Sequence, residues 1–322
     1  MNVRQPTSLS TVRSLATLTC VVALLPIGMG SLVTTMKAGM AFADWPSSDG
    51  QNMLLYPWFS DFRSNPEKFV EHGHRLAGML IGFVAVVLAG VGWRTGPGWI
   101  RRFTIGILLA VITQGMLGGA RVLLDAQVVA MTHSLTGALF FSGCVIFRTL
   151  LMKNWSLWMR QAENRLGAVS FAAAASFPAL VFSQYALGGA LRHLHMLRTE
   201  HALGAVAVLL IGGFTAARLL TSGHCLLRLC GLLIASTLSL QLLLGLGAMM
   251  TRFGFTDIGY VAVVGSLEQA VVCSLHTVAG MFLFASASIS SLAVCGLYHS
   301  GALTAVEAEI SGSPASTGRS PA

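Results

Sequence analysis

Four of the nine histidines stand in long apolar segments, where an ionisable side chain is costly. They are His74, His133, His201 and His276. Each is followed within three or four residues by a glycine, namely Gly78, Gly137, Gly204 and Gly280. This spacing puts both residues on one helix face, and the glycine lets another group approach the backbone closely. One such histidine could simply bond between helices, but four in the same setting indicate a binding site.

Two neutral imidazoles from facing helices are the usual axial ligands of haem iron in a helical bundle. The natural pairs are His74 with His133 and His201 with His276. The glycine beside each histidine would leave room for the flat macrocycle. Zinc fits less well, because no carboxylate or thiolate completes either pair. The pattern therefore predicts two haem sites.

Several further polar residues lie near the same ends of these segments. Candidates for binding haem propionates through charge-assisted hydrogen bonds are Arg75, Arg121, Arg192, Arg198 and Arg252. Each could equally be an ordinary interfacial cation. The histidines without an assigned role are His72, His193, His195, His224 and His299.

A carboxylate accompanies only one of the two histidine pairs. Glu71 lies three residues before His74, on the same helix face, whereas the equivalent position before His201 is Arg198. A carboxylate beside a macrocycle could transfer protons, which arginine cannot do. Alternatively, Glu71 is an interfacial acid stabilised by the helix dipole. The difference predicts that one haem is reacted upon and the other relays electrons.

The elements that must position these residues are transmembrane helices. The chain is 54% hydrophobic and only 10% charged, against about 25% charged residues in soluble domains. Apolar stretches of roughly 20 residues predict eight spans. They lie near 15–36, 70–93, 102–121, 127–150, 166–188, 200–220, 226–250 and 268–296. The net charge of +8 comes without basic runs interleaved with aromatics, so no nucleic-acid partner is expected.

Positive charge predicts the orientation of the spans. Arg13 precedes the first span, Arg101 and Arg102 fill the second connector, and Arg148 and Lys153 flank the fourth. Connectors rich in Lys and Arg stay in the cytoplasm, so both termini are expected there. Residues 298–322 are expected to form a disordered cytoplasmic tail, because from about residue 307 the chain is rich in Ser, Pro, Thr and Gly.

The sequence also contains an internal repeat. His201 follows His74 by the same 127 residues that separate Gln241 from Gln114. The repeat predicts two pseudo-symmetric four-helix bundles in the same orientation, one in residues 1–151 and one in residues 165–297. Three odd-numbered spans share a Gln-x-x-x-Gly motif: Gln114/Gly118, Gln184/Gly188 and Gln241/Gly245.

These features together resemble the haem A synthase family over roughly residues 25–297. The signature Glu71-His72-Gly73-His74-Arg75, the three later histidines and the segment Thr35–Pro46, with its continuation to Gly50, carry the resemblance. It implies oxidation of the C8 methyl of haem O to a formyl group, by successive hydroxylations and loss of water. In this reading His74 and His133 flank haem O in the N-terminal half, His201 and His276 ligate a resident haem b, and Glu71 is the catalytic carboxylate.

Two positions depart from the family pattern. Many relatives carry a cysteine pair in the first outer loop, where this chain has Trp45–Gly50 without cysteine, so disulfide-dependent steps are not expected. Ala202 follows His201 where the family has arginine, which weakens any propionate contact at that position.

Other functions fit part of the pattern. The four histidines alone would equally suit a di-haem b electron-transfer cytochrome. A transporter built from a parallel repeat would need helix-breaking residues beside coordinating groups, and neither Pro26 nor Pro178 has such neighbours.

The expected setting is the lipid bilayer of a bacterial cytoplasmic membrane, since the short N-terminus lacks an Arg- and Ser-rich transit peptide. An electron donor is an expected partner, and a haem O synthase is a candidate partner.

Overall fold

The long apolar segments are helical in the computed structural model of the chain, which describes residues 7–160 and 166–310. Within these residues, eight helices are long and apolar enough to cross a membrane. They are α1 (Thr7–Thr35), α3 (Pro66–Thr95), α4 (Gly98–Leu124), α5 (Gln127–Leu150), α7 (Ala168–His193), α8 (Arg198–Leu220), α9 (Cys225–Phe253) and α10 (Leu267–Ile310). The predicted all-α membrane fold with eight spans is confirmed.

Short elements lie in three of the connectors. The loop of residues 36–65, here called the outer loop, contains a 3-10 turn (Trp58–Ser60) and α2 (Asp61–Ser64). Helix α6 (Trp155–Arg160) lies between α5 and α7, and a second 3-10 turn (Thr256–Ile258) lies between α9 and α10. Asn65 caps α3 by accepting a hydrogen bond from the Lys68 amide, so this helix begins before the apolar run that predicted it.

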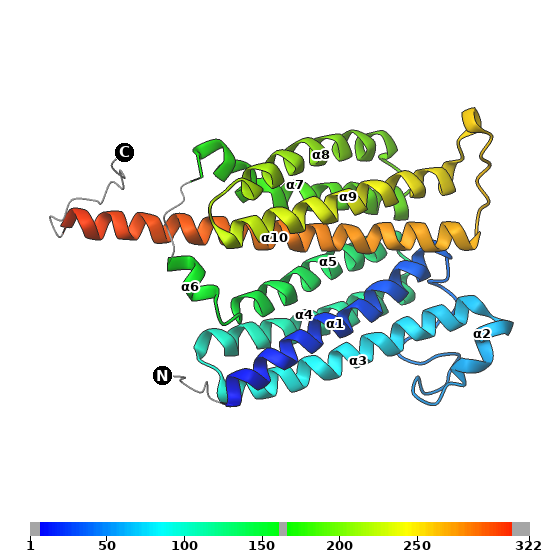
Figure 1. Cartoon of the computed structure of the whole chain (residues 1–322). Coiled ribbons are helices and arrows are strands. Elements are labelled where there is room, and N and C mark those ends of the chain that lie inside the picture. Colours follow the sequence, from blue (N-terminus) through cyan, green and yellow to red (C-terminus); the bar gives the residue numbers. More distant parts are fainter. Residues whose placement is uncertain (1–6, 161–165, 311–322) are drawn as a thin grey trace.

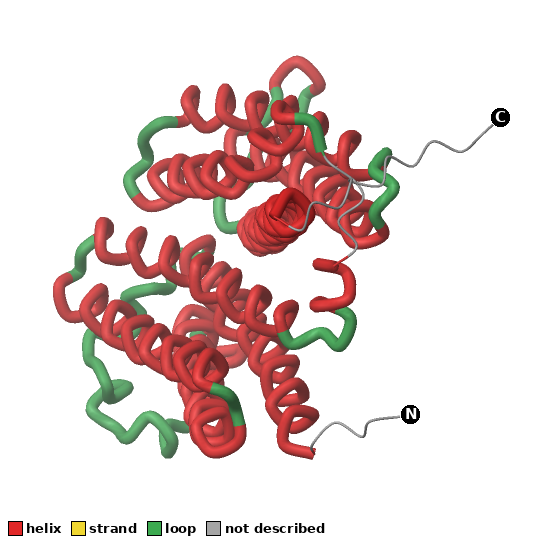
Figure 2. Tube along the Cα trace, turned by 90° about the vertical axis from the view of Figure 1, so that its left-hand side faces the viewer, coloured by secondary structure: helices red, strands yellow, loops and turns green. Residues whose placement is uncertain are grey.

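The helices pack in two groups of four. In the first group α1 contacts α3 and α5, and α4 contacts α3 and α5; in the second, α9 contacts α8 and α10, and α7 contacts α8 and α10. Figure 2 shows the two groups as separate clusters, and Figure 1 shows that α1 begins and α10 ends at the same end of the molecule. The pseudo-symmetry, the division into functional halves and the cytoplasmic location of that end stay predictions.

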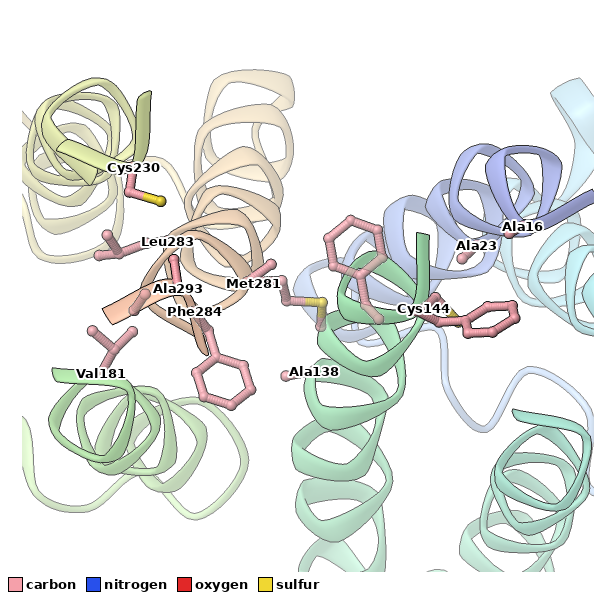
Figure 3. Packing of buried hydrophobic residues seen from close by; sticks show 14 of the residues in the cluster. Ala16, Ala23, Ala138, Cys144, Val181, Cys230, Met281, Leu283, Phe284 and Ala293 are labelled. Carbon is pink, nitrogen blue, oxygen red and sulfur yellow. The ribbon is translucent and has the colours of Figure 1, made fainter. Parts of the chain in front are cut away.

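The two groups are joined by apolar packing along α10. This helix contacts α1 and α5 as well as its own group. Met281 of α10 lies beside the helix that carries Ala138 and Cys144 (Figure 3). Phe141 of α5 packs edge-on against Phe282 of α10, with ring centroids 5.3 Å apart. The groups therefore share one buried apolar core.

Helix α10 is longer than the sequence indicates. It continues to Ile310, so residues 298–310 are helical where the sequence predicted a disordered tail. Ala, Leu and Glu dominate residues 302–309, and their helix propensity extends the last turns beyond the span. Residues 311–322 of the predicted tail lie outside the described residues.

The close packing of α8 gives a test of the fold. A Cβ on Gly212 would lie 2.6 Å from Cζ of Phe177, a fully buried side chain, whereas one on Gly213 would meet nothing within 4 Å. We expect Gly212→Ala to destabilise the protein by about 1–3 kcal/mol through overpacking. Gly213→Ala should leave stability unchanged or raise it, because alanine favours helix. Thermal unfolding of both purified variants measures the difference, and equal melting temperatures would contradict this packing.

Candidate functional site

The structure brings together both histidine pairs that the sequence predicted. The ring centroids of His74 and His133 are 6.1 Å apart with an interplanar angle of 81°, and those of His201 and His276 are 6.4 Å apart at 84°. Metal–imidazole bonds of about 2.0–2.1 Å, with each nitrogen about 1.1 Å from its ring centre, would separate two axial rings by roughly 6.3 Å. Both pairs therefore have the spacing of axial ligands.

The surroundings of the pairs limit which metal they suit. Within the described residues, no three His, Cys, Asp or Glu side chains converge to chelate an ion. A metal between either pair would need its other ligands from a bound molecule, as iron in a porphyrin has. The geometry thus fits haem better than a bare metal ion.

Each histidine ring lies against a glycine of a neighbouring helix. A Cβ added to this glycine would lie 2.8–3.4 Å from Cε1 of the ring in all four cases. The glycine–histidine contacts are Gly30–His74, Gly118–His133, Gly188–His201 and Gly245–His276. Three of these glycines end the Gln-x-x-x-Gly motifs. The fourth, Gly30, was not found from the sequence because Pro26 stands where the other helices have glutamine.

Hydrogen bonding fixes the tautomer of one ring. Nδ1 of His74 lies 3.0 Å from the carbonyl oxygen of Pro26. A carbonyl only accepts, so Nδ1 donates, and Nε2 of the neutral ring keeps the lone pair that a metal requires. Nδ1 of His133 and of His276 is buried without a partner among the described residues. No hydrogen bond at Nδ1 therefore sets the tautomer of these two rings, whose position follows from the glycine contacts.

A cavity of about 680 Å³ lies mainly within the first helix group and is closed on one side by residues of α7 and α10. His74, His133 and Glu71 all line it, together with mainly apolar side chains. A Cβ on Gly78 would meet nothing within 4 Å, and one on Gly137 would meet only the Gln114 side chain, at 3.9 Å. The glycine faces predicted to accommodate a macrocycle thus open into a space of the size that small-molecule ligands occupy.

The second pair is packed differently. The side chain of Gln184 lies against Gly204, and Nε2 of Gln241 would be 3.3 Å from a Cβ on Gly280. A planar ligand between His201 and His276 requires both glutamines to turn away. Turning breaks the contacts of their amide nitrogens, because Nε2 of Gln184 donates to the carbonyl oxygen of His201 at 2.8 Å and Nε2 of Gln241 lies 3.5 Å from Nε2 of His276. Their Oε1 atoms are buried without hydrogen-bond partners among the described residues, so no bond is lost at the oxygens. The residues present fit a haem after this rearrangement.

Glu71 connects the cavity to the outer loop. Its Oε1 pairs with Nη2 of Arg75 at 2.7 Å, and its Oε2 accepts a hydrogen bond from the amide of Phe42 at 3.2 Å. Nη1 of Arg75 donates to the carbonyl oxygens of Asp44 at 2.9 Å and Ser47 at 2.7 Å. Glu71 is only 3% exposed. The ion pair of Glu71 and Arg75 therefore holds the outer loop over the cavity. Arg75 uses both of its terminal nitrogens in these contacts with Glu71 and the outer loop.

His72, for which the sequence indicated no role, packs against the outer loop. It is buried, and its Nδ1 lies 3.1 Å from Oγ of Ser48, while its ring lies 4.8 Å from that of Tyr56. The Tyr56 hydroxyl donates to Asp61 at 2.8 Å. Burial and this hydrogen bond raise the pKa of Tyr56 to about 12. His72 thus anchors the outer loop beside the signature and does not reach the cavity lining.

The other candidate arginines divide between two places. Arg121 lines the cavity, and its Nη2 donates to the carbonyl of Gly39 at 2.5 Å. Arg198 is exposed and stacks on the ring of Phe253, 3.9 Å from its centroid. Arg252 lies near the same ring, with Nη2 3.4 Å from a nitrogen of His195. Of these three arginines, only Arg121 lines the cavity.

Arg192 joins the two helix groups. Although it belongs to the last turn of α7, it lines the first group's cavity together with His193, for which the sequence indicated no role. It donates to Oγ1 of Thr35 on α1 at 2.7 Å, to Ser31, and to Oγ1 of Thr277 on α10 at 2.5 Å. The ion pairs found among the described residues do not include it. A cation with only neutral partners beside an apolar cavity is a strong attractor for a ligand carboxylate.

The fold and these sites define a multi-span helical membrane protein with two facing pairs of histidines. A family profile described as cytochrome oxidase assembly protein, COX15-CtaA, matches residues 13–199. This is more than half of the chain, and the protein therefore belongs to that family.

Curated relatives match a shorter part of the sequence. A protein named heme A synthase from Methylobacterium radiotolerans is 31% identical over 129 residues, which are 38% of this chain and 35% of that protein. One of the same name from Brucella ovis is 31% identical over 117 residues, 34% of this chain and 32% of that protein. The chain spans about a third of the length of the curated relatives it matches.

The glycine contacts can be tested at adjacent positions of α7. A Cβ on Gly188 would lie 3.0 Å from Cε1 of His201, whereas one on Gly189 would meet the flexible Met131 at 3.4 Å. Gly188→Ala should therefore displace the ring and weaken haem retention between His201 and His276 by about tenfold or more. Gly189→Ala is the control. Haem content and absorption spectra of the purified variants measure the effect, and equal retention in both would argue against the contact.

Proposed function

We propose that the protein is a haem A synthase, which oxidises the C8 methyl of haem O to a formyl group. The observation that carries this proposal is the cavity of the first helix group, where two facing imidazoles and a buried carboxylate line one space. The relatives named heme A synthase support it. The conversion replaces two hydrogens of a methyl group by one oxygen, so an oxygen source and an electron partner must also be supplied.

In this proposal the cavity holds haem O as substrate. His74 and His133 flank its iron, and the Gly78 and Gly137 faces receive the macrocycle. Glu71 holds or accepts a proton at its carboxylate beside the ring edge. Arg121 and Arg192 would bind the propionates, because both line the cavity. Arg75 contributes mainly by holding Glu71 and the outer loop.

The second pair would hold a resident haem b through His201 and His276. A bound haem b would supply a one-electron carrier beside the substrate site. Gln184 and Gln241 would turn away to admit it. Arg198 and Arg252 lie around Phe253 at the outer end of this group and are the propionate candidates there. The residues of this half thus bind and orient the cofactor and carry no carboxylate equivalent to Glu71.

The proposed setting is a bacterial cytoplasmic membrane. The eight apolar spans require a lipid bilayer as solvent. Haem O is itself lipid-soluble, so direct transfer from a haem O synthase would keep it out of water. An electron donor would be a further partner.

A di-haem b electron-transfer cytochrome is the second candidate, because the two histidine pairs have nearly the same separation. Pigment extraction from protein co-expressed with a haem O synthase distinguishes the two. Haem O or haem A in the extract supports the synthase. Haem B alone, unchanged by co-expression, would identify the cytochrome.

Glu71 provides a direct test of the chemistry. Glu71→Gln keeps the size of the side chain and its acceptor oxygen but removes the base. We expect haem A formation to fall by about 10²–10⁴-fold, with haem still bound. Glu67→Gln, one turn earlier and exposed, is the matched control. Product analysis and absorption spectra are the measurements. Undiminished haem A formation in Glu71→Gln would remove this residue from the mechanism.

The two histidine pairs should differ in the pigment they hold. His276→Ala should lose the resident haem b, because one axial ligand is removed, whereas His133→Ala should mainly lose haem O. Extraction and chromatography of the pigments from each variant test this assignment. Loss of the same pigment in both variants would refute the proposed division between the halves.

A further inference from the structure

The cavity of the first helix group opens sideways between α3 and α4. A Cβ on Gly92 would meet Thr104, and one on Gly82 would lie 3.6 Å from Cγ1 of Val111, which sets the antiparallel register of these helices. One turn from the second contact, toward the outer loop, this register places Gly78 opposite Gly115. A Cβ on either of these two glycines would meet nothing within 4 Å among the described residues. The interface is therefore closed at Gly82 and open at Gly78.

Residues at this opening face both the cavity and the outside. Met79 lines the cavity and is 41% exposed, and Gly115 lines it and is also exposed. The outer surface around them is apolar, with Phe83 68% and Met116 65% exposed. No charged residue occurs in residues 76–93 or 103–120. The opening therefore faces lipid and not water.

The opening is closed at both of its ends along α3 and α4. Toward the outer loop, the indole of Trp45 lies against Gly119, so that a Cβ there would be 2.5 Å from Cδ2 of the ring. Toward the other end, the contact between Gly82 and Val111 closes the interface. The distance along α4 from Gly119 to Val111 is roughly 12 Å at 1.5 Å per residue. We call this opening the α3–α4 window.

We propose that the α3–α4 window receives the isoprenoid chain of the substrate and lets substrate and product exchange with the bilayer. This proposal rests on the proposed function, since haem O carries a hydroxyethylfarnesyl chain where haem B has a vinyl group. Arg121 and Arg192 attract the carboxylates of the ligand within the cavity. The apolar chain is most stable in lipid, which it reaches through the window without crossing water.

Filling the window from α4 separates its role from that of the haem site. Gly115→Leu places a branched side chain in the opening, and Gly106→Leu is the matched control. Gly106 lies on the same helix, is exposed, has open space at its Cβ position and does not line the cavity. Haem O and haem B are titrated into each full-length protein, purified with its resident haem, and binding is followed by absorbance.

We expect Gly115→Leu to weaken haem O binding by about tenfold or more beyond any weakening of haem B, because only haem O carries the chain that the window receives. Gly106→Leu should bind both as the unsubstituted protein does. Met79→Trp narrows the window from α3 and should reproduce the selective loss, which guards against misfolding of one variant. Unchanged haem O binding in both window variants, or equal weakening of haem O and haem B, would overturn the window alone. An unsubstituted protein that does not bind haem O would overturn the proposed function as well.

Discussion

The contact between each histidine ring and a glycine on the preceding transmembrane helix determines the geometry of both candidate sites. Without a Cβ at Gly30 or Gly188, an imidazole can lie against the backbone of the neighbouring helix. The ring is then fixed by two helices at once, its own and its neighbour. Repetition of this contact in both groups gives ring separations of 6.1 and 6.4 Å, although the side chains around the two pairs differ. The spacing of the pairs thus follows from helix packing and not from any one polar interaction.

Arg192 links the two helix groups through hydrogen bonds. It donates to Thr277, the residue after His276, and to Ser31, the residue after the glycine that supports His74. A carboxylate bound by this guanidinium in the first cavity would therefore be connected to the second pair through one side chain. Breaking such a buried set of hydrogen bonds is costly in lipid, where water cannot replace the lost partners. The arrangement favours a fixed relative position of the two sites.

Features that depend on local pattern could be predicted from the sequence. Hydropathy gave the eight spans, and the repeat with its spacing paired His74 with His133 and His201 with His276. Features that depend on packing between distant segments could not be predicted. Nothing local indicates that Arg192 reaches the cavity of the other group, or that Arg75 donates to the carbonyl oxygens of the outer loop. The Glu71–Arg75 pair is different, because its i,i+4 spacing on one helix is visible in the sequence. The extension of α10 was missed because composition near the C-terminus outweighed helix propensity in the prediction.

The two sites differ in access, and this difference bears on their roles. A site that exchanges its ligand needs space and a route, and the first cavity has open glycine faces and a lipid-facing window. A site that keeps its ligand needs close packing, and Gln184 and Gln241 lie close against the corresponding glycines of the second pair. Glu71, a buried carboxylate without an equivalent beside the second pair, lines the accessible site. The open cavity and the buried carboxylate therefore lie in the same helix group. This arrangement is expected if one haem is the substrate and the other stays bound.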